Sequence, residues 1–243
     1  MEIEPLPPPL SLEREVYRRL RDLIVSGNLV PGSLYSMNEL ATQLHVSRTP
    51  VAQAVARLVD HGMVRVEHRR GLRVLETSPH DLAEIYELRL LLEPRATHRA
   101  TGLMRPADHR RLKDALVALS RAAKGAGNAR DYLRRDADFH SVILQASGNR
   151  RLADFVQSLR DLQLIRNAST VDRTRPLADV VGDHERIYES IVKGAAAAAA
   201  REMHSHILLT GELLIKQETA ETGESADVLS SPWPTPDGAD LVE

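Results

Sequence analysis

One short stretch of the chain alternates apolar and polar residues in the manner of a β-strand, whereas apolar residues elsewhere recur mostly at helical spacing. The stretch is residues 63–67 (MVRVE), and a basic turn (HRRG, residues 68–71) connects it to a second short apolar segment at 72–75. Two short segments joined by such a turn predict a β-hairpin. The fold is therefore expected to be mainly α-helical, with a hairpin in its first third.

The composition agrees with a helical core and limits the kinds of binding and catalytic site that the chain can form. Aromatic residues make up 3% of the 243 residues, so Leu, Val, Ile and Ala must build the core, and a stacking platform for single-stranded nucleic acid is not expected. Cysteine is absent, which excludes disulfides, thiolate zinc fingers, iron–sulfur clusters and a cysteine nucleophile. A bound metal would need histidine and carboxylate ligands, and the chain has ten histidines.

Three segments with helical spacing precede the hairpin. The first spans residues 12–26 and the second 37–44. The third is expected to begin after Ser47, whose hydroxyl can accept an amide hydrogen, and to end near His61. Its predicted buried stripe is Val51, Ala54, Val55, Leu58 and Val59. Three helices followed by a basic hairpin predict a winged helix-turn-helix domain over residues 11–76.

The rest of the chain predicts an all-α helical bundle. Ser78 is expected to cap a long helix that reaches about residue 101. Further helices are predicted at 106–124, 131–146, 150–167, 176–193 and 195–221. The expected organisation is an N-terminal arm (1–10), the winged domain (11–76), a linker (77–80), the helical domain (81–221) and an acidic disordered tail (222–243).

The formal net charge of −2 conceals a difference between the two ends of the chain. Residues 218–243 contain seven acidic residues and no Lys or Arg, so the first 217 residues carry a net charge of +5. Residues 11–75 contain ten Arg and six acidic residues. Such a basic segment can meet phosphates. No apolar run reaches the length of a membrane span, and residues 1–10 are acidic and proline-rich, unlike a signal peptide, so we expect a cytoplasmic protein that does not bind membranes.

In a helix-turn-helix, the second helix of the pair enters the major groove with its first turn nearest the bases, and here that helix is the third one predicted. Arg48 can bond guanine in a bidentate way, Gln53 can bond adenine, and Thr49 can contact a phosphate or a thymine methyl group. The alternative is that these residues form an ordinary solvated helix face. The basic tip of the hairpin at residues 69–71 favours the DNA-binding interpretation, since it can approach a phosphate backbone or a minor groove.

Four ionisable residues interrupt the apolar stripes of the C-terminal helices, at a cost in free energy unless something neutralises them. They are Asp136, His140, His184 and His206. Each histidine alone fits a satisfied core or interface residue. Together they form a ligand set for a divalent metal ion. Asp138 and His204 point away from these faces and are left out.

The N-terminal part resembles the DNA-binding domain of GntR-family bacterial transcription regulators. The matching motifs are VPG (30–32), ELA (39–41), VSRTPV (46–51), RL (57–58), GMV (62–64) and RGLRV (70–74). The chain departs from the family at Ala52-Gln53, where Arg-Glu is common, and at Asn38, where some members have Arg. The residues expected to contact double-stranded operator DNA are Ser47, Arg48, Thr49, Gln53, Arg69, Arg70 and Gly71.

The C-terminal part resembles the FCD domain of the FadR-like GntR regulators. The matching motifs are ELR (87–89) with Glu93, DxxFH (136–140), GN (148–149), His184 and MxxH (203–206). The resemblance implies that the four residues bind zinc, nickel or a similar divalent ion, with zinc favoured, and that the ion helps to hold a small carboxylate effector. Arg89 is the candidate for the effector carboxylate, and the alternative is an intrahelical pair with Glu93.

These observations predict a homodimeric, ligand-responsive transcription regulator, most simply a repressor that a small carboxylate releases from its operator. Two alternatives remain at this point. One is a metal-dependent enzyme that its N-terminal domain merely localises, although no general base stands beside the cluster. The other is a regulator for which the metal ion itself is the signal.

Overall fold

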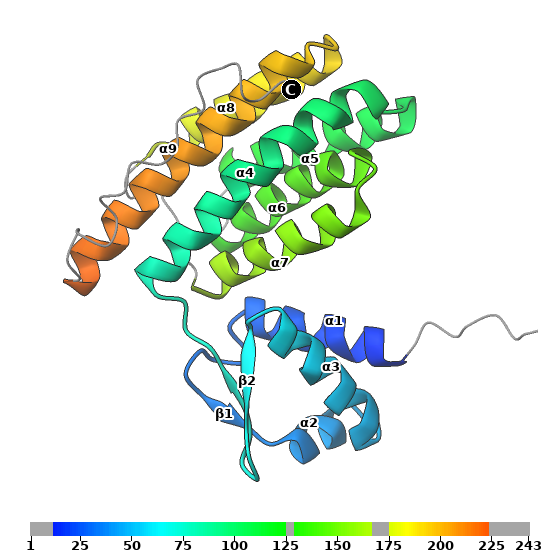
Figure 1. The fold of residues 1–243 in the computed structure, drawn as a ribbon, viewed down its shortest axis with the longest axis vertical. Helices are drawn as coiled ribbons and strands as arrows, with labels where there is room; N and C mark the ends of the chain where they lie inside the picture. Colours follow the sequence, from blue (N-terminus) through cyan, green and yellow to red (C-terminus); the bar gives the residue numbers. More distant parts are fainter. Residues whose placement is uncertain (1–11, 125–128, 167–174, 224–243) are drawn as a thin grey trace, which may run out of the picture. The chain divides into compact units, whose positions relative to one another are not determined.

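The computed structural model of the chain describes residues 12–124, 129–166 and 175–223. It is mainly helical, with a small sheet near the N-terminus, which confirms the predicted fold class (Figure 1). The chain divides into two compact units, Met1–Glu76 and Thr77–Glu243. The expected arm and nearly all of the expected tail lie outside the described residues.

The N-terminal unit contains three helices and three strands. Its elements are α1 (Leu12–Val25), β1 (Leu34–Tyr35), α2 (Met37–Gln43), α3 (Arg48–Asp60), β2 (Val64–Glu67) and β3 (Gly71–Val74). The strands are antiparallel in the order β1-β3-β2. Apolar side chains of all three helices and of the hairpin are buried together, as expected for a winged helix-turn-helix.

Two expectations for α3 are wrong in detail. Ser47 occupies the N-cap position, but its side chain makes no capping hydrogen bond. Val59 is 39% exposed and lies outside the buried stripe, because at about 100° per residue it is turned from buried Leu58 toward the exposed side of the helix, where Ala52 and Ala56 lie. A side-chain cap is found instead on α2, where the Ser36 hydroxyl accepts a hydrogen bond from the Glu39 amide at 3.5 Å.

Gly71 begins β3 at the point where β1 approaches most closely. Its φ is +125°, and a Cβ placed there would lie 2.1 Å from the carbonyl oxygen of Tyr35. No other residue type fits this position without moving β1, so glycine determines how the hairpin joins the sheet.

The C-terminal unit is a bundle of six helices in the described residues. They are α4 (Pro79–Leu103), α5 (Pro106–Lys124), α6 (Ala129–Ala146), α7 (Arg150–Arg166), α8 (Leu177–Val192) and α9 (Ala196–Thr222). Ser78 caps α4 reciprocally with Asp81: the Asp81 amide donates to the Ser78 hydroxyl at 3.1 Å, and the Ser78 amide donates to the Asp81 carboxylate at 2.6 Å. Since α4 begins at Pro79, residues 79 and 80 belong to its first turn and not to a linker.

Helices α4 and α9 lie side by side along the bundle (Figure 1). Gly211 of α9 makes this close packing possible, since a Cβ there would lie 2.6 Å from Cδ1 of Tyr86 on α4. Tyr86 and Phe139 are fully buried in the main core, which α4, α5, α6, α8 and α9 share. This packing brings the inner faces of α4, α6, α8 and α9 together.

Candidate metal centre and ligand pocket

The four predicted metal ligands meet in the middle of the C-terminal bundle. Asp136 and His140 come from α6, His184 from α8 and His206 from α9, and one ligand atom from each lies within 4.8 Å of all the others. The three histidines are buried and Asp136 is partly buried. Residues that are up to 70 positions apart in the sequence thus form one cluster.

Each histidine is oriented by an acceptor at its Nδ1 atom. Nδ1 of His140 lies 2.5 Å from Glu93 Oε2, Nδ1 of His184 lies 2.8 Å from the carbonyl oxygen of Val180, and Nδ1 of His206 lies 3.2 Å from Asp183 Oδ2. Nε2 of His140 lies 4.0 Å and Nε2 of His184 lies 3.0 Å from Asp136 Oδ1, so both of these atoms are directed toward Asp136. Acceptors of this kind hold metal-binding histidines in the correct tautomer.

Two of the inward-facing nitrogens lack a hydrogen bond. Nε2 of His140 and Nε2 of His184 are buried without one, although the second lies 3.0 Å from Asp136 Oδ1. Buried polar atoms without partners are uncommon and costly. A divalent cation bound by these two atoms, His206 and Asp136 would satisfy them, so the residues present fit a metal ion.

The charge states also suit a metal ion. Burial lowers the pKa of His140 to about 3 and that of His206 to about 4, so both rings are neutral at physiological pH, the form that binds metals. Burial alone would raise the pKa of Asp136, but the positive charge of Arg160 and the contact with His184 hold it well below its usual value. The cluster therefore contains an ionised carboxylate beside neutral imidazoles.

A buried charge network extends from this cluster to Arg89. The Nε atom of Arg89 donates to Glu93 Oε1 at 2.6 Å, and its Nη1 atom donates to Gln163 Oε1 at 2.8 Å. Arg160 donates to Asp136 and lies 3.5 Å from Glu93. Arg89 thus makes the intrahelical pair with Glu93 that the sequence offered as an alternative.

Arg89 also lines a pocket beside the cluster. Its pairing with Glu93 is therefore compatible with a role in binding a ligand. The pocket is partly open to solvent. Its lining residues are Tyr86, Arg89, Tyr132, Leu133, Asp136, Gln163, Val180, His206, Thr210 and Leu214. The hydroxyl groups of Tyr132 and Thr210 are buried without a protein hydrogen-bond partner. A ligand in this pocket would meet the guanidinium of Arg89, two hydroxyls and two of the predicted metal ligands.

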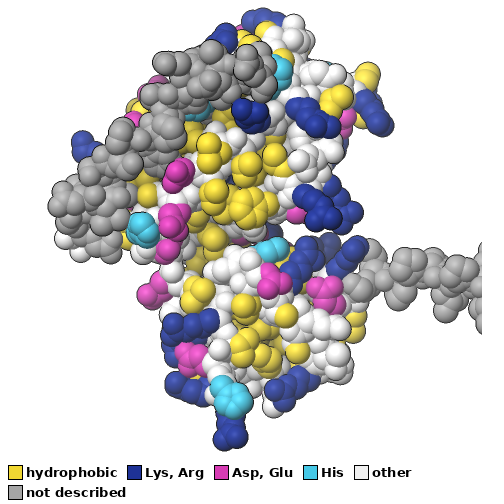
Figure 2. All heavy atoms as spheres, in the orientation of Figure 1, with side chains coloured by type: hydrophobic (Ala, Val, Ile, Leu, Met, Phe, Trp, Pro, Cys, Tyr) yellow, Lys and Arg dark blue, Asp and Glu magenta, His cyan; other side chains and the backbone are white. Residues whose placement is uncertain are grey.

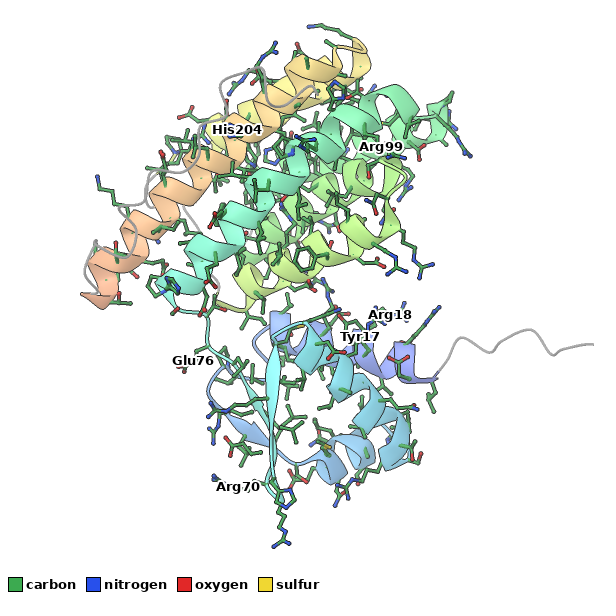
Figure 3. All side chains as sticks on the ribbon, viewed as in Figure 1. Tyr17, Arg18, Arg70, Glu76, Arg99 and His204 are labelled. Atoms are coloured by element: carbon green, nitrogen blue, oxygen red, sulfur yellow. The ribbon has the colours of Figure 1, made fainter. Side chains whose placement is uncertain are left out.

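The residues predicted to contact DNA all lie in the N-terminal unit. Ser47, Arg48, Thr49 and Gln53 are exposed at and near the start of α3. Arg69 and Arg70 are exposed at the tip of the β2–β3 hairpin, where Arg70 is labelled in Figure 3. Arg70 also lies 3.1 Å from the carboxylate of Glu67. Gly71 is only partly exposed, and its role in the structure is the close approach to β1 described above.

Comparison with known proteins identifies the family. Residues 12–74 match the family described as bacterial regulatory proteins, gntR family, and residues 84–209 match the FCD domain. The chain belongs to the GntR family and carries an FCD domain. Within the described residues of this GntR-family protein, no helix is both long and apolar enough to span a membrane.

Several relatives of this GntR-family chain are named regulators. It is 25% identical over 226 residues to the HTH-type transcriptional repressor RspR of Escherichia coli K12, covering 89% of this chain and 95% of RspR. It is 34% identical over 141 residues to the Nta operon transcriptional regulator of Aminobacter aminovorans, covering 57% and 65%. Among solved structures, McbR/YncC of E. coli has the same fold, with a TM-score of 0.75 at 22% identity over 86% of this chain and 99% of that one.

The family assigns the general function. The GntR-family chain is a DNA-binding transcription regulator, as are its named relatives. The alternative of a metal-dependent enzyme is therefore wrong.

Proposed function

We propose that this regulator binds a divalent metal ion through Asp136, His140, His184 and His206, and that a small carboxylate in the adjoining pocket controls its binding to operator DNA. The observation that carries the proposal is that the four-residue cluster shares a pocket with Arg89, since Asp136 and His206 belong to both. Zinc is the favoured ion, with nickel as the next candidate, because imidazole and carboxylate ligands suit both.

The pocket suits a small hydroxy- or keto-acid. A bound divalent ion would supply positive charge and an open coordination position for an acid oxygen. The guanidinium of Arg89 offers donors in a plane for a carboxylate, and the hydroxyls of Tyr132 and Thr210 offer hydrogen bonds to further oxygens.

The sense of regulation that we propose is repression relieved by the acid, acting on a homodimer. RspR, one of the relatives, is named a repressor. A two-fold dimer would present two α3 helices to a pseudo-palindromic operator. The acid would act by binding more tightly to the conformation that has lower affinity for DNA, since a ligand shifts an equilibrium only by its differential affinity.

Metal content tests the first part of the proposal. Wild-type protein is purified, supplied with zinc and dialysed. Inductively coupled plasma mass spectrometry is then expected to find one divalent ion per chain. His184→Ala and His206→Ala are expected to lose most of it. His204→Ala is the matched control, because His204 lies on the same helix, labelled in Figure 3, but is outside the cluster. Wild-type protein that takes up no divalent ion would refute the metal site.

Operator release tests the second part. A high-affinity DNA site is first selected from random sequences with the wild-type protein, and fluorescence anisotropy then follows its release by a panel of small hydroxy- and keto-acids. Arg89→Lys keeps the charge but loses the planar donors, so the acid concentration needed for release is expected to rise about tenfold or more. If metal removal abolishes DNA binding while no acid changes it, the protein is a metal sensor.

The proposed DNA contacts are tested on the same selected site. Arg48→Ala is expected to weaken binding by about 1–3 kcal/mol and to relax the preference at one base pair. Arg19→Ala removes another exposed positive charge, on α1, and should change affinity much less. Equal effects of the two substitutions would mean that Arg48 contributes only charge.

A further inference from the structure

One carboxylate lies among three arginines on the β2–β3 hairpin. Glu67 accepts a hydrogen bond from the Nε atom of Arg73, which lowers the pKa of Glu67 and keeps it ionised at neutral pH. Its oxygens also lie 3.1 Å from Nη1 of Arg70 and 3.5 Å from Nη2 of Arg65. In Figure 2, Lys and Arg side chains gather at the end of the N-terminal unit that carries the hairpin, with an acidic side chain among them. The hairpin thus carries a negative charge on the surface proposed to meet phosphates.

The three arginines are held to different degrees. Arg73 also donates to the carbonyl oxygen of Gly32 at 2.5 Å, and its side chain is only 26% exposed. The side chains of Arg65 and Arg70 are 62% and 65% exposed. Ion pairs that are open to solvent contribute only about 0–1 kcal/mol. Glu67 and Arg73 therefore form a fixed part of the hairpin, whereas Arg65 and Arg70 can exchange Glu67 for a phosphate.

Stability of the hairpin accounts for only part of this arrangement. Arg65 and Arg73 are directly opposite each other in the register of β2 and β3, and like charges in such a pair are unfavourable. A carboxylate between them offsets this repulsion. Arg70 lies in the turn, outside the paired positions, and is nevertheless held by Glu67. Its contact points to a role in DNA binding.

We propose that Glu67 restrains Arg65 and Arg70 and thereby raises the preference of the protein for its operator over other DNA. The inference rests on the proposed DNA contacts of the hairpin and adds Arg65 to them. Non-specific binding depends almost entirely on the attraction between basic side chains and phosphates. An arginine held by Glu67 reaches only phosphates near its fixed position, whereas a released one can follow the phosphates of any DNA. Operator binding also uses base contacts from α3, so it depends less on these two side chains.

Removal of the charge tests the proposal in the full-length protein. Glu67→Gln keeps the size of the side chain and an acceptor for Arg73, but it no longer attracts the other two arginines. On non-operator DNA at fixed salt, affinity is expected to rise at least about fivefold, and the slope of log affinity against log salt is expected to steepen by about 1. On the selected operator, affinity should change by less than about twofold. Fluorescence anisotropy measures both, and their ratio gives the specificity.

Two further variants support the measurement. Glu76→Gln removes the same charge from an exposed position at the opposite end of the hairpin from Arg70 (Figure 3) and should leave both affinities near those of wild type. Arg65→Gln should weaken non-operator binding more in the Glu67→Gln background than in wild type, because only there is Arg65 released. Thermal unfolding checks that each variant is folded.

The possible results are distinct. Equal gains on both DNAs would mean that Glu67 acts only through net charge, and lower affinity for both would mean that it holds the arginines in place for binding; either result overturns the proposal. If Arg70→Ala changes neither affinity, the hairpin does not contact DNA and the proposed contacts themselves fail. If Arg70→Ala weakens binding but Glu67→Gln has no effect, the contacts stand and the role of Glu67 is refuted.

Discussion

Glu93 Oε2 lies 2.5 Å from Nδ1 of His140, with both side chains completely buried, while the other oxygen of Glu93 accepts a hydrogen bond from Arg89. Burial alone would raise the pKa of Glu93, but the positive charges of Arg89 and Arg160 and the hydrogen bond with His140 hold it well below its usual value. One ionised carboxylate on α4 thus contacts both a proposed metal ligand and the arginine of the pocket.

Replacement of this carboxylate should weaken metal binding without removing a ligand. For Glu93→Gln we expect a loss of about 10–100-fold in zinc affinity, because the substituted amide orients and polarises the His140 ring less well. Competition with a coloured chelator measures the affinity. Glu189→Gln, an exposed change on α8, serves as the control. Unaltered affinity in Glu93→Gln would show that His140 needs no carboxylate partner.

Removal of the metal should destabilise the C-terminal unit. At a zinc concentration about 100 times the dissociation constant, binding contributes about 2.7 kcal/mol to the free energy of unfolding. We therefore expect a chelator to lower the melting temperature of the wild type by about 5–10 °C. The same chelator should have little effect on His184→Ala, whose Nε2 ligand is missing. If the chelator lowers the melting temperature of both proteins equally, its effect does not come from metal bound at the cluster.

Gly211→Ala should destabilise the protein even though alanine favours helices by about 1 kcal/mol. The new Cβ would lie 2.6 Å from the ring of Tyr86, and overpacking of this kind costs about 1–3 kcal/mol. Because Tyr86 lines the pocket, its displacement should also weaken the response to the acid. Gly102→Ala is the matched control, since nothing lies within 4 Å of its Cβ position, and it should be neutral or stabilising in thermal unfolding.

Gly71→Ala should disrupt the hairpin and with it DNA affinity. The Cβ would lie 2.1 Å from the backbone of Tyr35, so β1 and β3 would have to separate. Gly223 also has a positive φ, +69°, but open space around it, so Gly223→Ala introduces backbone strain alone, at a cost of about 1–3 kcal/mol. We expect Gly71→Ala to lose more stability and more affinity for the selected DNA than this control. Equal losses in the two variants would mean that backbone strain, and not the contact with Tyr35, accounts for the effect of Gly71→Ala.

The helices could be predicted because their apolar residues recur at regular spacing. The start of α4 could also be predicted, since Ser78 and Asp81 form a local capping arrangement. Strand β1 could not: it has two residues, too few for an alternating pattern, and forms only because β3 lies beside it. The exposure of Val59 could not be predicted either, because it lies at the edge of the apolar stripe, and the width of the stripe that is buried depends on the packing of neighbouring elements.

The predicted metal ligands came from ionisable residues that interrupt apolar stripes, and the same signal was present at two residues that were overlooked. Asp183 follows buried Val180 and precedes buried Ile187, and Arg160 lies between buried Val156 and Leu164. Their partners lie on other helices, so their connection to His206 and Asp136 depends on packing that one sequence does not specify. The pocket hydroxyl of Tyr132 is unpredictable for the same reason.

On the proposed function, the double contact of Glu93 has a consequence for the cell. If binding of the acid changes the affinity for the ion by some factor, binding of the ion must change the affinity for the acid by the same factor. Favourable coupling would mean that a bacterium short of zinc needs a higher concentration of the acid before its genes respond. The supply of zinc would then set the concentration of the acid at which the regulated genes are expressed.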